Sequence, residues 1–515
     1  MKIEFVNPPR TFIDRSEIAP PLGLLRLAEA ARFTGSSIGI SDFNLLYHVD
    51  PQLANAEEFY AHATDRLLKK DADVYCFTSM AVDSHIAIHL SRLLKKKRPE
   101  VVVVFGGTHF SSIAEAVIDQ FPWVDYVVTG EGETFIQELP SFLEEHQPRA
   151  VVNGSRLANT ENRDLPFDLL DLDLYFSVNE NRCLDFETAR GCRFSCSFCY
   201  SPNHYKGGFR DFSIDNAISG LQKAQELGFR NVFFVEDNFL NDPARAADLC
   251  TELKNARLQL SWQAYATFPQ LTSEIIPKMA RAGCTAVFAG IDAVGKESRR
   301  IHKKAFVRDA SVLQHRVREC VSNGIIPTCA FLLSPPSCPG GSDVDETLFF
   351  ALAARNAGAQ IRLNTLTLYN QTRSTLTSSA SLAYDEFKVR LMLDVPEVVE
   401  ENYYAFQNPE LFPFHARYVS STEWRDFVSL VHCLYTLLEV FPKTLEYLWN
   451  SENITPTEIA HKMLGNTGAL LDIPKAARRD AQLLAAVQVL ESLAARKGAL
   501  QPILEMESSR FLVFN

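Results

Sequence analysis

Long hydrophobic runs, an excess of basic charge and a secretion signal are all missing from this sequence of 515 residues. No apolar run approaches the roughly 20 residues that a membrane-spanning helix needs. The N-terminal stretch Met1–Phe5 has the pattern of a β-strand rather than of a signal peptide. We therefore expect no membrane span and a cytoplasmic location, where the eleven cysteines would stay reduced.

Basic charge is scarce. The chain carries 51 Lys and Arg against 63 Asp and Glu, which gives a net charge of −12. A protein surface that follows the phosphates of a nucleic acid needs a basic patch. The basic run Lys95–Arg98 ends a predicted helix, where positive charges stabilise the helix dipole. We therefore expect no nucleic-acid partner.

The composition is that of a folded protein, with 46% hydrophobic and 22% charged residues. The chain length predicts two or three domains. Over residues 1–148, short apolar strands alternate with helical patterns such as 22–32 and 85–97. This alternation predicts an α/β fold with a doubly wound parallel sheet, in which ligands bind beyond the carboxyl ends of the strands. Those ends carry glycine-rich and polar residues, namely Ser79, Met80, Gly106, Gly107, Thr108, His109, Gly130 and Glu131.

Three further regions follow along the chain. Residues 149–182 accumulate Asn, Asp and Pro and predict a linker. Residues 183–375 contain six strand patterns separated by helices, which predicts a six-stranded partial β/α barrel with its site at the carboxyl ends of the strands. Residues 376–515 predict a helical C-terminal domain. Six of its side chains either cover the barrel or pack in a core: Tyr403, Tyr404, Phe406, His415, Arg417 and Tyr418.

Cys192, Cys196 and Cys199 stand close together in a Cys-x3-Cys-x2-Cys pattern. Three thiolates in one short loop can bind three irons of a cubane cluster and leave the fourth iron open to a ligand. The alternative is a zinc ion whose fourth ligand is His204. The loop follows the first strand of the β/α series, where a barrel builds its active site. This position favours the iron–sulfur cluster, and the nearby Phe198 would shield it from water.

With Phe198 as its aromatic residue, the cysteine pattern resembles that of the radical S-adenosylmethionine (SAM) superfamily. The resemblance implies that SAM binds the open iron and is cleaved to methionine and a 5′-deoxyadenosyl radical. The electron would come from an external donor such as flavodoxin or ferredoxin. Further similarities imply SAM contacts by Glu236, Asp237 and Asp292, although Asp237 and Asp292 equally suit helix caps. The pair Phe209-Arg210 resembles the family's step into its first barrel helix.

The segments 106–109 and 130–134 resemble the cobalamin-binding domain that is fused to one large class of radical SAM enzymes. The resemblance implies that the loop containing Ser79 and Met80 faces the corrin, and that the two glycine-rich segments contact the cofactor. His109 either contacts the corrin or only packs. Asp42-Phe43-Asn44 lacks the histidine of the cobalt-binding Asp-x-His-x-x-Gly loop, so we expect no histidine ligand. A domain that keeps the fold and binds nothing is the alternative.

This pairing of domains implies a biosynthetic methyltransferase that acts on an unactivated carbon of a small-molecule or peptide substrate. Cys338 is not required by that scheme, although its Pro/Gly-rich context predicts exposure. Cobalamin-dependent ring formation or rearrangement is the second possibility. Methylthio transfer to tRNA calls for a second cluster site and a basic module, and neither is evident. A non-enzymatic iron–sulfur electron-transfer protein would have no need of SAM-like motifs at the strand ends.

Overall fold

The structure is a computed structural model. It describes residues 1–10, 15–54, 58–145, 148–156, 165–206, 208–292, 294–303, 309–338, 341–372, 382–385, 407–467, 475–495 and 499–512. Two compact units make up the chain. Unit 1 comprises Met1–Phe239, Thr251–Gln263 and Thr367–Tyr418, and unit 2 comprises Leu240–Cys250, Ala264–Leu366 and Val419–Asn515. Within the described residues, no helix combines the length and the apolar character that crossing a membrane requires.

Unit 1 opens with a parallel sheet in the strand order β2-β1-β3-β4-β5-β6. The order reverses between β1 and β3, and such a switch point leaves a crevice at the carboxyl ends of the strands. This sheet confirms the predicted doubly wound fold. Its strands are β1 (Lys2–Asn7), β2 (Ser37–Asp42), β3 (Val74–Thr78), β4 (Val102–Gly106), β5 (Tyr126–Thr129) and β6 (Ala150–Asn153).

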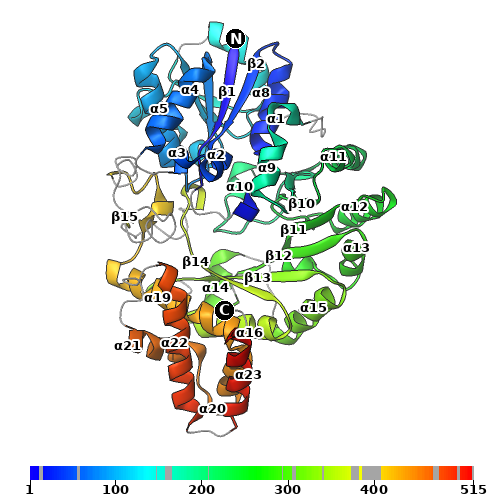
Figure 1. The fold of residues 1–515 in the computed structure, drawn as a ribbon, viewed down its shortest axis with the longest axis vertical. Helices are drawn as coiled ribbons and strands as arrows, with labels where there is room; N and C mark the ends of the chain where they lie inside the picture. The colour runs from blue at the N-terminus through cyan, green and yellow to red at the C-terminus, as the bar shows by residue number, and fades with distance from the viewer. Residues whose placement is uncertain are drawn as a thin grey trace. The chain divides into compact units, whose positions relative to one another are not determined.

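Helices cover both faces of this sheet because its strands are apolar on both sides. Tyr75 and Phe77 point into the core beneath α4 (Phe59–Lys70) and α5 (Ser84–Lys97). The alternate residues Val74 and Cys76 belong to the core beneath α1 (Leu22–Arg32) and α8 (Glu133–Glu145). Figure 1 shows α4 and α5 on one side of the strands and α1 and α8 on the other.

A second six-stranded sheet has the consecutive order β14-β13-β12-β11-β10-β7. Helices separate successive strands, so neighbouring strands run parallel, as the registers of β7 with β10, β12 with β13 and β13 with β14 show. This open series confirms the predicted six-stranded arrangement. The strands are β7 (Cys183–Phe186), β10 (Asn231–Phe234), β11 (Ser261–Thr267), β12 (Cys284–Asp292), β13 (Ile326–Leu333) and β14 (Gln360–Thr365). The helices include α11 (Ile214–Glu226), α12 (Pro243–Asn255), α13 (Ile276–Arg281), α15 (Ala310–Ser322) and α16 (Val344–Asn356).

Short elements lie where the sequence analysis expected none. Strand β6 and helix α9 (Leu172–Val178) fall inside the predicted linker 149–182. A two-stranded antiparallel ribbon forms between β8 (Ala189–Gly191) and β9 (Phe209–Asp211), so Phe209-Arg210 lies on a short strand that ends just before α11 begins at Ile214. Elements of three to seven residues carry too little periodicity to be recognised from sequence.

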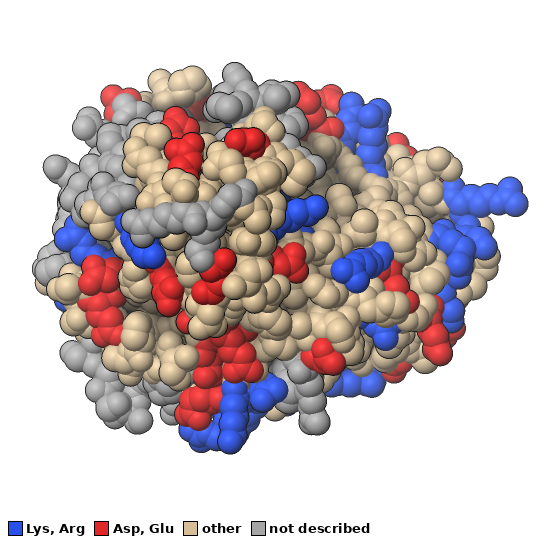
Figure 2. All heavy atoms as spheres, turned by 90° about the horizontal axis from the view of Figure 1, so that it is seen from below, with Lys and Arg blue, Asp and Glu red and all other residues tan. Residues whose placement is uncertain are grey.

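The C-terminal part is helical, as predicted. Residues up to Tyr418 nevertheless belong to unit 1, and Phe412 lies in the core beneath α4 and α5. On the face that Figure 2 shows, acidic and basic side chains of the described residues are interspersed rather than gathered by sign. The helices of this part are α19 (Ser421–Val440), α20 (Pro442–Glu452), α21 (Pro456–Thr467), α22 (Lys475–Ala494) and α23 (Gln501–Leu512).

Candidate active site

The β8–β9 ribbon carries the cysteine loop between its two strands. Gly191 pairs with Phe209, so the chain leaves the ribbon directly before Cys192 and returns to it ten residues after Cys199. Gly191 has φ +85°, and a Cβ there would overlap the carbonyl of Gly208. Only glycine combines this left-handed conformation with such a close approach. The ribbon therefore closes the neck of the loop and holds the three cysteines in one place.

The three thiols form a donor set that fits an iron–sulfur cluster. Cys196 is buried, and Cys192 and Cys199 are half-buried. Burial raises the pKa of Cys199 to about 12, and the negative charges of Asp237, Cys196 and Cys192 add to the shift. Thiolates in such surroundings are stabilised by a bound metal. Within the described ranges, no three His, Cys, Asp or Glu side chains are arranged to hold a single ion. In a cubane, the thiolates bind three different irons.

Glu236 and Asp237, which follow β10, hold the two flanks of the cysteine loop. Glu236 Oε1 accepts a hydrogen bond from the backbone N–H of Thr188 before the loop. Asp237 accepts hydrogen bonds from Tyr200 Oη at 2.9 Å and from Ser201 Oγ at 2.8 Å after the loop. Burial raises the pKa of Glu236 to about 7 and also raises that of Asp237. Both predicted SAM residues thus have a positioning role.

One carboxylate oxygen of Glu236 is available to bind a ligand. Its side chain is buried, and Oε2 has no hydrogen-bond partner among the described residues. A buried carboxylate oxygen of this kind is costly unless a donor, such as the ammonium group of a ligand, satisfies it. Phe198, the aromatic residue of the motif, is half-buried in the same loop. These features fit a SAM site beside the cysteines.

In unit 2, Asp292 ends β12 in a strained conformation. Its φ is +56°, and the register between β12 and β13 shifts between Gly290 and Asp292. Non-glycine residues held at positive φ cost free energy and cluster at functional sites. Burial lowers the pKa of the nearby His302, against the opposing charge of Asp292. This backbone strain supports a functional role for Asp292 and argues against an ordinary helix cap.

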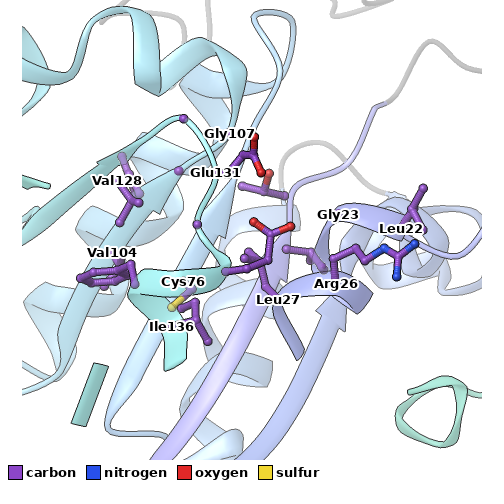
Figure 3. A pocket seen from close by; sticks show the side chains of 18 of the residues that line it. Leu22, Gly23, Arg26, Leu27, Cys76, Val104, Gly107, Val128, Glu131 and Ile136 are labelled. Atoms are coloured by element: carbon purple, nitrogen blue, oxygen red, sulfur yellow. The ribbon is translucent and has the colours of Figure 1, made fainter. Parts of the chain in front are cut away.

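A cavity of about 240 Å³ lies at the carboxyl ends of β3, β4 and β5, beside α1 and α8. Figure 3 shows Gly107 and Glu131 toward one end and Val104, Cys76 and Ile136 toward the other. Four of the predicted cobalamin residues line it: Gly106, Gly107, Gly130 and Glu131. His204 and Tyr205, which follow the last cysteine, line the same cavity. The cavity therefore reaches from the N-terminal sheet to the cysteine loop.

Backbone glycines shape the wall of this cavity. Gly107 has φ +93°, and a Cβ there would lie 2.8 Å from the carbonyl oxygen of Ser79. Gly130 has φ +75°, and its N–H donates to Ser111 Oγ at 3.1 Å. Neither position tolerates a side chain without strain. A bulky ligand can therefore approach the backbone closely here, which fits the nucleotide tail of cobalamin.

The other predicted cobalamin residues lie outside the lining of this cavity. Ser79 Oγ and His109 Nε2 are buried and have no hydrogen-bond partner among the described residues. The His109 ring lies 5.6 Å from the ring of Phe412, and burial lowers its pKa to about 3. His109 is thus a neutral side chain packed within unit 1. Met80 is 49% exposed, and Thr108 is the first residue of α6 (Thr108–Ser112).

Asp42 has a structural role. Its carboxylate caps α2 (Phe43–Val49) by accepting from the N–H of Asn44 at 3.0 Å. It also accepts hydrogen bonds from Asn7 Nδ2 at 2.8 Å and from Tyr175 Oη at 2.5 Å. All of its strong acceptor sites are therefore used within the fold, at the point where a cobalt-binding loop would begin in classical cobalamin proteins.

A second cavity, of about 760 Å³, lies beside Gly130 and Glu131 and shares both residues with the first. Its lining is largely polar and includes Asn153, Arg156, Asn203, Lys206 and Glu410. Both cavities also share His204. The Gly130–Glu131 segment thus contributes to two cavities of unit 1.

The predicted aromatic lid is only partly described. Tyr403, Tyr404 and Phe406 lie outside the described residues. His415 is buried, with its ring 4.9 Å from that of His85 on α5, and Tyr418 is also buried. Arg417 Nη1 lies 3.6 Å from Asp385 Oδ2. The three described members thus belong to unit 1 together with the N-terminal domain, and two of them are packed in its interior.

Cys338 in unit 2 is half-buried rather than exposed. Burial raises the pKa of its thiol to about 11, and the charge of Glu423 adds to the shift. The neighbouring backbone N–H of Ser337 donates to Glu423 Oε1 at 2.9 Å, which holds the loop against α19. A thiol with so high a pKa is a poor nucleophile near neutral pH.

The sequence analysis missed a buried network of arginines and glutamates. Arg190 Nη2 lies 2.7 Å from Glu133 Oε1 and 2.8 Å from Glu187 Oε1. Arg26 of α1 contacts Glu187 at 3.1 Å. Burial alone would raise the pKa of Glu187, but Arg190 and Arg26 hold it below its usual value. The only sequence signal was an arginine two residues before the first cysteine. Its partner Glu187 lies three residues before it, but Glu131 and Glu133 lie far away along the chain.

Two family models match the chain. The B12 binding domain matches residues 12–139, and the Radical SAM superfamily matches residues 186–334. The chain belongs to the radical SAM superfamily and carries a B12-binding domain. A solved structure of the radical SAM methyltransferase TsrM from Kitasatospora setae contains cobalamin and a [4Fe–4S] cluster. The B12-binding match contains most of the cavity lining, and the radical SAM match contains the three cysteines together with Glu236, Asp237 and Asp292.

Several curated proteins resemble this radical SAM chain. An uncharacterized methyltransferase of Pyrococcus horikoshii is 25% identical, over 68% of this chain and 78% of the relative. The anaerobic magnesium-protoporphyrin IX monomethyl ester cyclase of Synechocystis is 25% identical, over 39% of this chain and 42% of the relative. The hopanoid C-3 methylase of Methylococcus capsulatus is 24% identical, over 55% of each. The chain thus spans about half or less of the last two.

Solved structures share the fold of this radical SAM chain. The methyltransferase TsrM from Kitasatospora setae has a TM-score of 0.58 at 17% identity, over 75% of this chain and 78% of that chain. The cobalamin-dependent SAM radical enzyme OxsB also has a TM-score of 0.58, at 14% identity, over 99% of this chain and 84% of that chain. At such low identity, these likenesses concern the fold alone.

Proposed function

We propose that this chain is a cobalamin-dependent radical SAM methyltransferase that adds a methyl group to an unactivated carbon of a small-molecule or peptide substrate. One observation carries the proposal: a single cavity is lined both by Gly106 and Gly107 of the B12-binding sheet and by His204 and Tyr205 behind the cysteine loop. The two cofactor regions thus meet within one compact unit.

The residues of this chain fit the groups that the proposal requires. Cys192, Cys196 and Cys199 would bind the cluster, and Phe198, Glu236 and Asp237 of unit 1 would contact SAM. A SAM contact by Asp292 of unit 2 stays a prediction. Gly106, Gly107, Gly130 and Glu131 would line the cobalamin cavity. Ser79 and Met80 after β3, and Thr108 and His109 of α6, would contact cobalamin outside the lining of that cavity. When bound, SAM on the cluster supplies a carbon-centred radical, and cobalamin supplies the methyl group.

The protein's own contribution is to position the cofactors and to exclude water from them. The apolar side of the cavity includes Val104, Val128 and Phe135, which belong to the core on the α1 and α8 face of the sheet and suit a flat aromatic base. Arg26, Glu131 and Arg190 at the polar side suit a sugar and a phosphate. Asp237 and Glu236 hold the cysteine loop at both flanks, so the thiols are preorganised.

A second function is favoured by one comparison. The magnesium-protoporphyrin IX monomethyl ester cyclase of Synechocystis belongs among the relatives, and its name describes ring formation rather than methylation. The methyltransferase names of the Pyrococcus horikoshii relative and of the hopanoid methylase favour methyl transfer. We also propose the cytoplasm as the location, and flavodoxin or ferredoxin as the electron donor.

The decisive experiment is an anaerobic reconstitution of the full chain with iron, sulfide and cobalamin, followed by reduction in the presence of SAM that carries a deuterated methyl group. We expect bound iron and cobalamin, 5′-deoxyadenosine, and labelled methylcobalamin, all measured by mass spectrometry and metal analysis. A C196A variant, which lacks the buried cysteine, is the control and is expected to form no 5′-deoxyadenosine.

Each outcome has a clear meaning. Absence of both 5′-deoxyadenosine and labelled methylcobalamin would refute the proposed enzyme. Formation of 5′-deoxyadenosine with bound cobalamin but without a labelled methyl group would favour the cyclase function instead. Full activity of C196A would contradict the assignment of the cysteine loop.

A further inference from the structure

Two arginines stand opposite each other on the ribbon that carries the cysteine loop. Arg190 on β8 pairs with Arg210 on β9. Like charges directly opposite on neighbouring strands repel each other unless a counter-charge lies between them. Here Glu131 supplies that charge: its Oε2 lies 3.1 Å from Arg190 Nη1, and its Oε1 lies 2.5 Å from Arg210 Nη2. One glutamate of the B12-binding domain therefore joins both strands of the ribbon.

This contact is buried, so solvent screens it little. The exposed side-chain fractions are 8% for Glu131, 11% for Arg190 and 20% for Arg210. Glu133 adds a second contact to Arg190 at 2.7 Å. Because the loop 192–208 begins and ends on the ribbon, Glu131 acts on both ends of the segment that contains the three cysteines.

The backbone around Glu131 is held rigidly by the N-terminal sheet. The preceding Gly130 donates its N–H to Ser111 Oγ, and Gly154 donates its N–H to the carbonyl of Thr129 at 2.8 Å. A Cβ at Gly154 would overlap the carbonyl of Glu131, so the two segments are in close contact. Glu131 is therefore preorganised as an anchor and does not depend on the ribbon for its position.

The same residues line the cavity assigned to cobalamin. Glu131, Glu133 and Arg190 all contribute to its wall, together with Gly106 and Gly107. A ligand that fills the cavity therefore contacts both Glu131 and Arg190. Arg210 Nη1 is buried and has no hydrogen-bond partner among the described residues, although Arg210 itself lines neither cavity.

We propose that Glu131 is a positioning residue that couples occupancy of the cobalamin cavity to the placement of the cluster loop. The identity of the occupant as cobalamin rests on the proposed function. Coupling between two sites is reciprocal: if bound cobalamin orders the cluster loop, then a loaded cluster must increase the affinity for cobalamin by the same factor. That factor is the quantity to measure.

The test compares the cobalamin dissociation constant of the full chain with and without its cluster, for wild type and for E131Q. Glutamine keeps the size of the side chain and removes the charge that binds the two arginines. We expect wild type to bind cobalamin roughly 5-fold to 150-fold more tightly when the cluster is loaded. For E131Q we expect the two constants to agree within about twofold, because the ribbon is no longer anchored.

The matched control is the variant D125N. Asp125 lies just before β5, and Glu131 lies just after it. Asp125 forms a similarly buried ion pair with Lys95 at 2.7 Å and does not line either cavity. D125N is expected to retain the wild-type ratio. If E131Q does not accumulate as folded protein, R210Q removes one of the two arginines and is expected to lower the ratio in the same way.

Hydrogen exchange on the cobalamin-free and cluster-free chain provides a second readout. E131Q is expected to accelerate exchange of the ribbon amides at 189–191 and 209–211, and D125N is not. A wild-type ratio near one, or an unchanged ratio in E131Q, would overturn the coupling and leave the proposed function intact. No cobalamin binding by wild type in either state would overturn the proposed function and, with it, the coupling.

Discussion

Asp237 accepts a hydrogen bond from Tyr200 Oη at 2.9 Å, and Tyr200 is the residue that follows the third cysteine. The second carboxylate oxygen accepts from Ser201 Oγ at 2.8 Å. Hydrogen bonds to a charged acceptor are roughly twice as strong as neutral ones. The carboxylate therefore fixes the segment that must keep Cys199 in place while a cluster assembles.

We predict that D237N lowers cluster loading because the amide offers only one acceptor to two donors. Iron bound after reconstitution is expected to fall at least twofold, and 5′-deoxyadenosine formation at least tenfold, which corresponds to about 1.4 kcal/mol. Y200F, which removes one of the two hydrogen bonds, is expected to fall between wild type and D237N. Full iron content in D237N together with a weakened SAM affinity would show instead that Asp237 acts mainly on SAM.

Gly107 and Gly23 both line the smaller cavity but differ in their surroundings. A Cβ at Gly107 would meet Ser79 O at 2.8 Å at a φ of +93°, whereas a Cβ at Gly23 would meet nothing within 4 Å. We predict that G107A loses at least roughly 1–2 kcal/mol of stability, because the left-handed backbone is strained by any side chain. G23A lies in α1 and is expected to lose nothing, and to gain up to about 1 kcal/mol.

Urea unfolding of the N-terminal domain signal, followed by circular dichroism or tryptophan fluorescence, compares the two alanine variants. The reverse order of stability would mean that the loop after β4 does not need its positive φ. Equal stability would mean that the close contact with Ser79 relaxes at no cost.

The long apolar strands could be predicted from sequence, and the short connecting elements could not. Strands such as Val74–Thr78 and Ile326–Leu333 show clear apolar runs bounded by turn residues. The ribbon strands Ala189–Gly191 and Phe209–Asp211 have three residues each and a polar composition. Their pairing depends on Gly191 and on contacts across the cysteine loop, which no local pattern reveals.

In the candidate site too, some residues could be predicted from the sequence and their contacts could not. Gly106, Gly107, Gly130 and Glu131 could be placed at strand ends because parallel strands share one carboxyl edge. The role of Glu131 could not be predicted, since its partners Arg190 and Arg210 lie 59 and 79 residues away. The hydrogen bonds of Asp237 to residues 36 and 37 positions earlier are equally nonlocal.

Asp83, at the start of α5, gives the stability of the N-terminal domain a pH dependence. Its carboxylate accepts from the N–H of Met80 at 2.7 Å and lies 3.5 Å from Arg10 Nε. Burial raises its pKa to about 7 from an ordinary value of 3.8, and Arg10 offsets only part of this shift. Between these two values the native state holds a proton that the unfolded chain has released.

The contribution of Asp83 is therefore fully present near pH 4 and is lost as the pH rises through about 7. Asp83 thus contributes roughly 4 kcal/mol to the free energy of unfolding at the acidic end of this pH range. D83N is neutral at every pH, so we predict that its melting temperature rises relative to wild type between pH 5 and pH 7 and then levels off. Calorimetry at four pH values measures this difference. The exposed Asp173, changed to Asn, serves as the control, and a pH-independent difference for D83N would contradict the prediction.

Cys338 is expected to have no covalent role in methyl transfer. With its pKa raised to about 11, the thiol stays protonated near neutral pH. The loop around it is held by the backbone N–H of Ser337 on Glu423, which a substitution at position 338 leaves in place. We therefore predict that C338S keeps at least about half of the wild-type rate of labelled methyl transfer from SAM, because serine preserves the size of the side chain and loses only the sulfur. A variant that still forms 5′-deoxyadenosine but transfers no methyl group would show that the thiol carries the methyl group after all.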